Sequence, residues 1–271
     1  MFDVPTAPAA ELGLDATGLG TTDPPRPAPD WLIQTDYTEH RLGTLKSGKE
    51  AEVFLVERRS ADASCLLAHK RYRPRDPGQG ELRELGFSKG TTYHHDAVYR
   101  SGWHLNSRDA RAMETHTAYS RQLKAAIWPE MELAALRRAW DAGASVPYPV
   151  EHLDDGVLME FLGDEHGAAP RLVDARLDRP ALEEAWRQLR HNLRLMCRAH
   201  IVHADLSVYN LLWWQERLVV IDLPQAVDDR TNAQAPGLLH RDIANVATWF
   251  GRRGVRVDAD GLFVELLAEL F

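Results

Sequence analysis

The feature that most constrains this chain is the segment His203-Ala-Asp-Leu-Ser-Val-Tyr-Asn210, followed by Asp222 twelve residues after its asparagine. Leu189 to Ile201 carries apolar residues at helical spacing, and two short apolar runs flank the turn 215–217. The pattern predicts a helix, a polar loop and a hairpin that ends at an aspartate. Without its neighbours, the octapeptide would more often contain a His and an Asp that cap a helix or form hydrogen bonds than two catalytic residues. The predicted helix and hairpin on either side therefore decide its interpretation.

The polar residues of this region are those that phosphoryl transfer requires. Asp205 can orient a hydroxyl group, the amide oxygen of Asn210 can ligate a metal ion, and Asp222 can hold Mg²⁺ on nucleotide phosphates. The reaction depends mainly on positioning and charge neutralisation, and hard oxygen ligands that leave Mg²⁺ partly hydrated suit it. We therefore predict a kinase-like active site with Asp205 as a catalytic residue and with Asn210 and Asp222 as metal ligands.

Three motifs in sequence order resemble the RIO family of atypical kinases. They are HADLSVYN (203–210), IDLPQAVD (221–228) and LHRDIAN (239–245). Ordinary protein kinases have lysine two positions after the catalytic aspartate and Phe-Gly after the metal aspartate, whereas this chain has Ser207 and Leu-Pro-Gln. The resemblance is to a bacterial member of the RIO1-like branch of serine protein kinases, and it adds Ser207 to the residues expected to bind the nucleotide.

This resemblance implies an α+β fold of the bilobal protein-kinase-like type. A small β-rich N-lobe and a mainly helical C-lobe are expected, without an activation segment. The interval from Asp222 to Arg241 is about twenty residues, too short for the activation segment and peptide-binding platform of ordinary protein kinases. The phosphoryl acceptor therefore stays open.

A second set of nucleotide contacts is expected near the start of the N-lobe. Residues 43–54 look like the RIO phosphate loop, in which SGKE or TGKE replaces the glycine-rich motif of other kinases. Ser47, Gly48, Lys49 and Glu50 form its tip, where small residues let backbone N–H groups approach phosphate oxygens. An ordinary hairpin turn would show the same Ser-Gly-Lys pattern, but this turn precedes a strand that carries a lysine.

That strand spans 65–73, and the resemblance makes Lys70 the lysine that positions ATP and belongs to the catalytic set. Such a lysine needs a carboxylate partner from a helix. Glu130 and Glu132 both lie in the next strongly helical stretch. We prefer Glu132, which is four residues before Leu136, and Glu130 remains the alternative.

The stretch 155–163 has the apolar strand, acidic residue and terminal glycine expected of the linker that reads adenine between the lobes. Met159, Glu160, Phe161 and Leu162 are expected to frame the base. A plain core strand with a β-turn at each end would give the same pattern, so both interpretations stay open.

Length and composition suit one bilobal domain, because 271 residues with 44% hydrophobic content can bury a sizeable core. We expect a flexible Pro- and Ala-rich tail over 1–34, the N-lobe over 35–160 and the C-lobe over 161–271. The stretch 75–107 matches the place of a long flexible loop in RIO proteins, and its role and that of the tail stay open. Arg171 resembles part of a segment shared by bacterial members, and the sequence gives it no mechanism beyond capping the C-lobe near the cleft.

No secretory signal is expected, and no run approaches the roughly eighteen apolar residues of a membrane span. Cys65 and Cys197 lie in apolar segments without metal-ligand spacing, which suits buried thiols in a reducing compartment. A formal net charge of −8 argues against a nucleic-acid surface. We therefore expect a cytoplasmic protein that binds neither membranes nor DNA.

The preferred functional hypothesis is an ATP- and Mg²⁺-dependent serine/threonine protein kinase that acts on another protein or on itself, with Mn²⁺ as an alternative metal. A second hypothesis, implied by the family's link with small-subunit maturation, is a nucleotide-gated ATPase that associates with ribosomal particles. A small-molecule phosphotransferase of the aminoglycoside type shares the HxDxxxxN spacing. Ser207 and the IDLPQ segment argue against this third hypothesis.

Overall fold

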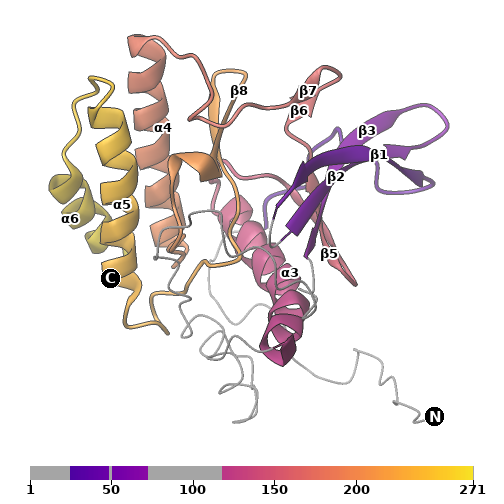
Figure 1. Ribbon diagram of the computed structural model, residues 1–271, viewed down its shortest axis with the longest axis horizontal. Coiled ribbons are helices and arrows are strands. Elements are labelled where there is room, and N and C mark those ends of the chain that lie inside the picture. The colour runs from indigo at the N-terminus through magenta and orange to yellow at the C-terminus, as the bar shows by residue number, and fades with distance from the viewer. Residues whose placement is uncertain (1–24, 49–50, 73–117, 271) are drawn as a thin grey trace.

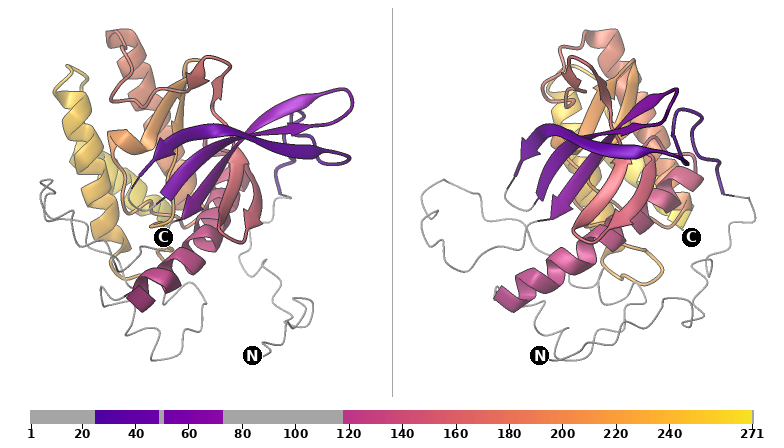
Figure 2. Two further views of the ribbon diagram at one scale, coloured as in Figure 1. Left: turned by 45° about the vertical axis from the view of Figure 1, so that its right-hand side comes forward. Right: turned by 90° about the vertical axis from the view of Figure 1, so that its right-hand side faces the viewer.

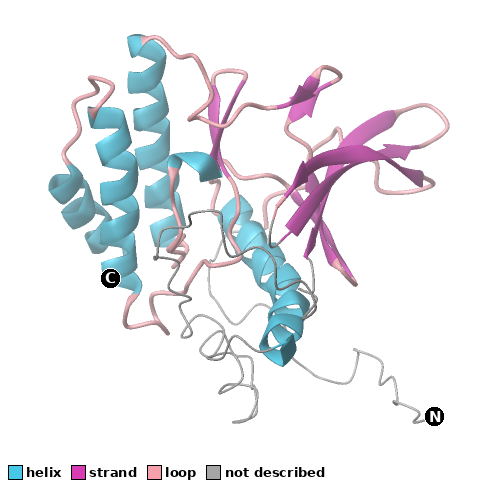
Figure 3. Ribbon diagram, in the orientation of Figure 1, coloured by secondary structure: helices cyan, strands magenta, loops and turns pink. Residues whose placement is uncertain are grey.

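The computed structural model describes residues 25–48, 51–72 and 118–270. In these ranges an antiparallel sheet is followed by a mainly helical part, as the sequence predicted (Figures 1 and 3). The main sheet has five strands in the order β1-β2-β3-β5-β4. These strands are β1 (Thr38–Ser47), β2 (Ala51–Arg59), β3 (Ser64–Tyr72), β4 (Pro149–Leu153) and β5 (Gly156–Glu160).

One long helix, α3 (Ala118–Asp141), contacts β3, β4 and β5 of this sheet (Figure 2). Its side chains Leu133, Leu136 and Ala139 are buried and recur every three residues, so they lie along one side of the helix. This packing fixes the position of Glu132, the neighbour of Leu133, relative to β3. The sheet and α3 together are called the N-lobe below.

The C-lobe is the remainder of the chain after β5. Its helices α4, α5 and α6 pack together, with α6 in contact with both α4 and α5 (Figure 1). The elements are β6 (Gly163–Asp164), β7 (Gly167–Ala168), α4 (Arg179–Arg198), η1 (Val208–Asn210), β8 (Leu211–Trp214), β9 (Arg217–Val220), α5 (Ala235–Gly251) and α6 (Ala259–Leu270).

The helix predicted before His203 is the second half of α4. This helix begins after Asp178, whose carboxylate accepts a hydrogen bond from the backbone N–H of Ala181 (3.0 Å). Pro180 occupies the first turn, where a missing N–H costs no hydrogen bond. Apolar side chains such as Leu189 and Leu193 are buried along one side and hold the helix on the core.

The predicted hairpin after the polar loop is formed by β8 and β9. These strands pair from Leu211 opposite Val220 to Trp214 opposite Arg217. The backbone N–H of Leu218 donates a hydrogen bond to the side-chain oxygen of Gln188 on α4 (2.7 Å). The hairpin is thus attached to the helix that precedes the polar loop.

The largest hydrophobic cluster extends through both lobes. It includes Val157 and Met159 from the sheet, Leu136 from α3, and Leu189 and Leu211 from the C-lobe. Because apolar side chains pack densely, a continuous cluster of this kind holds the two lobes in one arrangement. None of the described helices has the length and apolarity needed to span a membrane.

Residues 25–34 pack against the N-lobe, although the sequence placed them in the flexible tail. Leu32 is buried in a second cluster with Val56 and Leu67. Trp31 meets Tyr148 edge to face, with ring centroids 6.4 Å apart. Apolar side chains late in a proline-rich stretch therefore form part of the folded unit, and residues 1–24 lie outside the described ranges.

Candidate active site

Three charged side chains meet at the boundary between the lobes. The Nζ atom of Lys70 on β3 lies 2.7 Å from Oε1 of Glu132 on α3 and 2.5 Å from Oδ1 of Asp222, which follows β9. The side chains of Lys70 and Glu132 are 12% and 1% exposed, whereas that of Asp222 is 40% exposed. One cation thus bridges a buried carboxylate and a partly open one.

The charges of this cluster stabilise one another. Burial alone would lower the pKa of Lys70, but the carboxylates of Asp222 and Glu132 raise it above its ordinary value. Burial would raise the pKa of Asp222, and the charge and hydrogen bond of Lys70 more than offset this and lower it. Lys70 and Asp222 are therefore both ionised at neutral pH.

Glu132 has a partner for each carboxylate oxygen. The hydroxyl of Tyr72, two residues after Lys70 on β3, donates a hydrogen bond to Oε2. Burial raises the pKa of Glu132, and the contacts with Lys70 and Tyr72 counteract that shift. Glu130, the alternative partner for the lysine, is exposed on α3, so the geometry favours Glu132.

The loop that carries Asp205 is held from one side by a neutral histidine. Nε2 of His203 lies 3.1 Å from the carbonyl oxygen of Ile221, and Nδ1 accepts a hydrogen bond from the backbone N–H of Asp205 (3.3 Å). Burial lowers the pKa of His203, so Nε2 carries the proton and Nδ1 is the acceptor. The ring therefore links Asp205 to the residue before Asp222.

The same loop is held from α5 by Asp242. Its carboxylate accepts hydrogen bonds from the backbone N–H groups of Ala204 (2.7 Å) and Leu206 (3.1 Å), and Arg241 donates one to the carbonyl oxygen of Ala204. Ala204 has a φ of 63°, a left-handed conformation that alanine rarely adopts. Burial of Asp242 raises its pKa to about 7. The sequence had marked 239–245 as a motif without assigning Asp242 this function.

Asn210 and Asp222 offer oxygen atoms to a metal ion. The amide nitrogen of Asn210 donates a hydrogen bond to the carbonyl oxygen of Asp205 (2.9 Å), so the amide oxygen is the atom that could contact a metal ion. In the part of the chain that the structure describes, no three His, Cys, Asp or Glu residues gather into a metal site. One carboxylate and one amide still fit Mg²⁺, which takes other ligands from water and substrate phosphates.

The predicted phosphate loop lies between β1 and β2. The backbone N–H of Gly48 donates a hydrogen bond to the carbonyl oxygen of Ala51 (2.9 Å), and a Cβ atom on Gly48 would lie only 3.1 Å from that oxygen. A glycine therefore suits this close turn. Ser47 is the last residue of β1, and Lys49 and Glu50 lie outside the described residues.

The predicted adenine linker runs from the end of β5 into the C-lobe. Met159, Phe161 and Leu162 are buried, and the carbonyl oxygen of Leu162 accepts a hydrogen bond from the backbone after β7 (2.8 Å). The carboxylate of Glu160 accepts one from the backbone N–H of Tyr148 (3.0 Å), and burial raises the pKa of Glu160. Glu160 therefore supports the linker from the side of the sheet.

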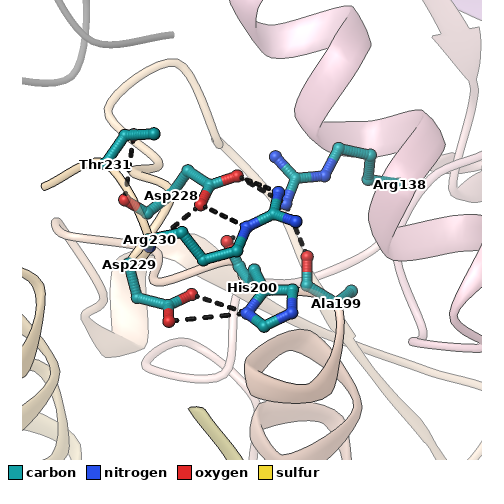
Figure 4. Close-up of polar contacts among 7 residues, drawn as sticks. All are labelled: Arg138, Ala199, His200, Asp228, Asp229, Arg230 and Thr231. Carbon is teal, nitrogen blue, oxygen red and sulfur yellow. Dashed lines mark hydrogen bonds and ion pairs between the residues drawn. The ribbon is translucent and has the colours of Figure 1, made fainter. Parts of the chain in front are cut away.

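A second polar cluster connects α3 to the start of the polar loop, and it is called the Arg138 cluster below (Figure 4). Its members are Arg138, His200, Asp228, Asp229 and Arg230. The guanidinium of Arg138 donates hydrogen bonds to the carbonyl oxygens of Ala199 (2.5 Å) and His200 (3.1 Å), and it lies 3.1 Å from Asp228. His200 in turn contacts Asp229 through Nδ1 (3.1 Å). The helix that carries Glu132 is thereby attached to the residues that lead to His203.

The structure places the predicted residues in two neighbouring groups. Lys70, Glu132 and Asp222 meet directly, and Asp205 and Asn210 are joined through a backbone contact of the polar loop. Ser207 belongs to the same loop, where its carbonyl oxygen accepts a hydrogen bond from the backbone N–H of Asn210 (2.9 Å). Sequence reasoning missed the contributions of Tyr72, Arg138 and Asp242, of which only Asp242 lay in a recognised motif.

Comparison with known proteins gives a consistent family relationship. The RIO domain family matches residues 92–262. The RIO-type serine/threonine-protein kinase Rio1 of Haloferax volcanii is 40% identical over 86% of this chain and 70% of its own length. A probable serine/threonine-protein kinase RIO1 homolog of Encephalitozoon cuniculi is 32% identical over 83% of this chain, which spans 57% of that relative.

Solved structures support the fold. The Rio2 kinase of Chaetomium thermophilum, crystallised as an ADP/Mg²⁺-phosphoaspartate complex, superposes with a TM-score of 0.55 at 15% identity. The match covers 85% of this chain and 62% of that one. At this identity the likeness shows the protein-kinase-like fold alone.

Proposed function

This chain belongs to the RIO family of atypical serine/threonine-protein kinases, and we propose that its site transfers the γ-phosphoryl group of ATP to a serine or threonine hydroxyl. The observation that carries the proposal is the position of Lys70, whose ammonium group lies within 2.7 Å of carboxylates from two different lobes. A lysine held by a helix carboxylate beside a metal-binding aspartate is the arrangement that aligns nucleotide phosphates.

Each residue has a separate task in this proposal. Lys70 binds the α and β phosphates and is held in place by Glu132. Asn210 and Asp222 hold Mg²⁺, which neutralises charge on the transferred phosphoryl group when it is bound. Asp205 accepts the proton of the acceptor hydroxyl, and the loop contacts of His203 and Asp242 keep Asp205 in position.

The acceptor is another protein or this chain itself. From α5 onward the C-lobe is helical. A short segment between Val220 and Ala235, which contains Asp222, connects the β8–β9 hairpin to α5. A segment of this length leaves little room for a platform that binds an extended peptide. Autophosphorylation or recognition of a folded partner therefore suits the chain better than capture of a long unstructured substrate.

A second candidate function is slow ATP hydrolysis coupled to association with a ribosomal particle. The same short segment favours it, and the related Rio2 kinase structure is described as a phosphoaspartate complex. In this case an aspartate carboxylate would receive the phosphoryl group and water would release it. Lys70, Asn210 and Asp222 would have the same tasks in both functions.

Incubation of the full chain with γ-labelled ATP, Mg²⁺ and cell extract separates these candidates. Acid-stable label on serine or threonine, lost in Asp205→Ala, is the expected result for a protein kinase. Free labelled phosphate without such a product, or an acid-labile label that hydroxylamine removes, supports the hydrolytic alternative. A parallel reaction with Mn²⁺ tests the choice of metal.

A further inference from the structure

We propose that Lys46 and Arg171, one from each lobe, form a cationic clamp that binds the phosphate chain of the nucleotide. The inference rests on the proposed function and extends it by two positive side chains that were not among the nucleotide contacts expected from the family resemblance. Lys46 lies near the end of β1, directly before the tip of the predicted phosphate loop, and Arg171 lies in the C-lobe beside β8.

The register of the sheet places Lys46 on the same face as Lys70. Lys46 pairs with Val53 on β2, and Val53 pairs with Lys70 on β3. Residues directly opposite one another on neighbouring strands project to the same face. With strands about 5 Å apart, the Cα atoms of the two lysines are about 10 Å apart. Lys46 is therefore close enough for its long side chain to share a polyphosphate with Lys70.

The C-lobe brings Arg171 to the site from the other side. Arg171 forms a β-bridge with Leu212, which follows the metal ligand Asn210 by two residues. The neighbours Leu172 and Leu211 are fully buried, and they are joined by a backbone hydrogen bond of 2.8 Å. Because side chains alternate along extended backbone, Arg171 and Leu212 project away from that buried face.

Electrostatic interactions support the proximity of these groups. Burial lowers the pKa of Lys46, and the positive charges of Arg171 and Lys70 lower it further, whereas Asp222 raises it. Lys70 is already balanced by Glu132 and Asp222. Lys70, Lys46 and Arg171 carry three positive charges against the two negative charges of Glu132 and Asp222, so one positive charge remains for a triphosphate to neutralise.

The test compares Lys46→Met and Arg171→Met with the control Arg176→Met, which removes one exposed charge from the same C-lobe segment. Calorimetry on the full chain measures dissociation constants for Mg·ATP, Mg·ADP and adenosine. Each clamp variant is expected to weaken Mg·ATP binding about tenfold, as is typical for loss of one charge-assisted contact. Adenosine affinity should stay unchanged, and Arg171→Lys should retain most of the ATP affinity.

A second measurement distinguishes a binding function from a structural one. Because Lys46 and Arg171 repel each other in the free protein, either methionine variant should melt without nucleotide at the same temperature as the wild type or higher. A lower melting temperature together with weaker adenosine binding would overturn the clamp and indicate a structural contribution.

The remaining outcomes separate the clamp from the proposed function. If the wild type binds Mg·ATP and both methionine variants bind it equally well, the clamp is wrong and the kinase proposal stands. If the wild type binds no Mg·ATP, both proposals fail. If a methionine variant does not fold, Lys46→Gln removes the same charge with a polar side chain and should weaken Mg·ATP binding to a similar extent. The ATP affinity of the wild type should then also fall as the salt concentration rises.

Discussion

The Nζ atom of Lys70 lies 2.5 Å from Oδ1 of Asp222, so the proposed phosphate-binding cation and the proposed metal-binding anion are in direct contact. A bound magnesium nucleotide would have to share or replace this contact, because phosphate oxygens attract Lys70 and Mg²⁺ attracts Asp222. Glu132 would keep Lys70 in place while Asp222 held the metal ion.

Replacement of Lys70 by methionine should destabilise the fold. The change leaves Glu132 as a buried carboxylate without its cation, and loss of one partner of such a pair typically costs about 3–5 kcal/mol of unfolding free energy. Urea denaturation measures the difference. The double variant Lys70→Met/Glu132→Gln should recover a large part of the loss, and purely additive losses would contradict a charge pair.

Replacement of Asp205 and replacement of Asp222 by alanine should give different kinetic defects. Asp222→Ala should abolish metal-dependent nucleotide binding, because this carboxylate is the proposed metal ligand. Asp205→Ala should bind Mg·ATP normally and turn it over more slowly by about two to four orders of magnitude, as expected for loss of a general base. Calorimetry and steady-state turnover check the pair, and normal binding and turnover in both variants would refute the assignments.

The Arg138 cluster should control the position of α3. Arg138→Met removes two hydrogen bonds to the end of α4 and the contact with Asp228, so the helix that holds Glu132 becomes less constrained. The expected result is about a tenfold lower kcat with a smaller change in adenosine affinity. Arg137→Met is the matched control, because Arg137 is the exposed neighbour on the same helix. Equal kinetics in the two variants would show that the cluster does not act on the site.

Stability should depend on pH through Asp242. The pKa of this group is about 7 in the folded protein, above the value of 3.8 for an unburied aspartate. Its stabilising contribution is therefore complete below about pH 4 and is lost as the pH rises through about 7. Asp242→Asn should remove the part of the decline in unfolding free energy that Asp242 causes between about pH 4 and 7. Denaturation curves at both ends of this range measure it, and parallel slopes would contradict the shift.

The sequence predicted the local elements of the site well, because motif spacing and hydrophobic periodicity report on neighbouring residues. The helix before His203 and the β8–β9 hairpin agree with the structure, in which Glu132 contacts Lys70. Arg138 was not predictable in this way, since its partner Ala199 lies 61 residues further along the chain. Periodicity shows which side of a helix is buried and does not identify the distant backbone that it meets.

The predicted adenine linker shows the same limit. A buried strand that ends in an acidic residue was recognised, yet Glu160 binds the backbone of Tyr148 with its carboxylate. The sequence also placed residues 25–34 in the tail on composition alone. Composition measures average polarity, and a single leucine such as Leu32 can still occupy a site in the core.

The segment before β1 has a practical consequence for anyone who shortens this chain. The backbone N–H of Arg26 donates a hydrogen bond to Asp141 (3.2 Å), and the Arg26 guanidinium lies 4.0 Å from the ring centre of Trp140. This stretch therefore packs against the C-terminal end of α3. Trimming at residue 35, shortly before β1 begins, would uncover Leu67 and remove the contacts of Arg26 with α3. Expression variants should therefore keep everything from Pro25 onward.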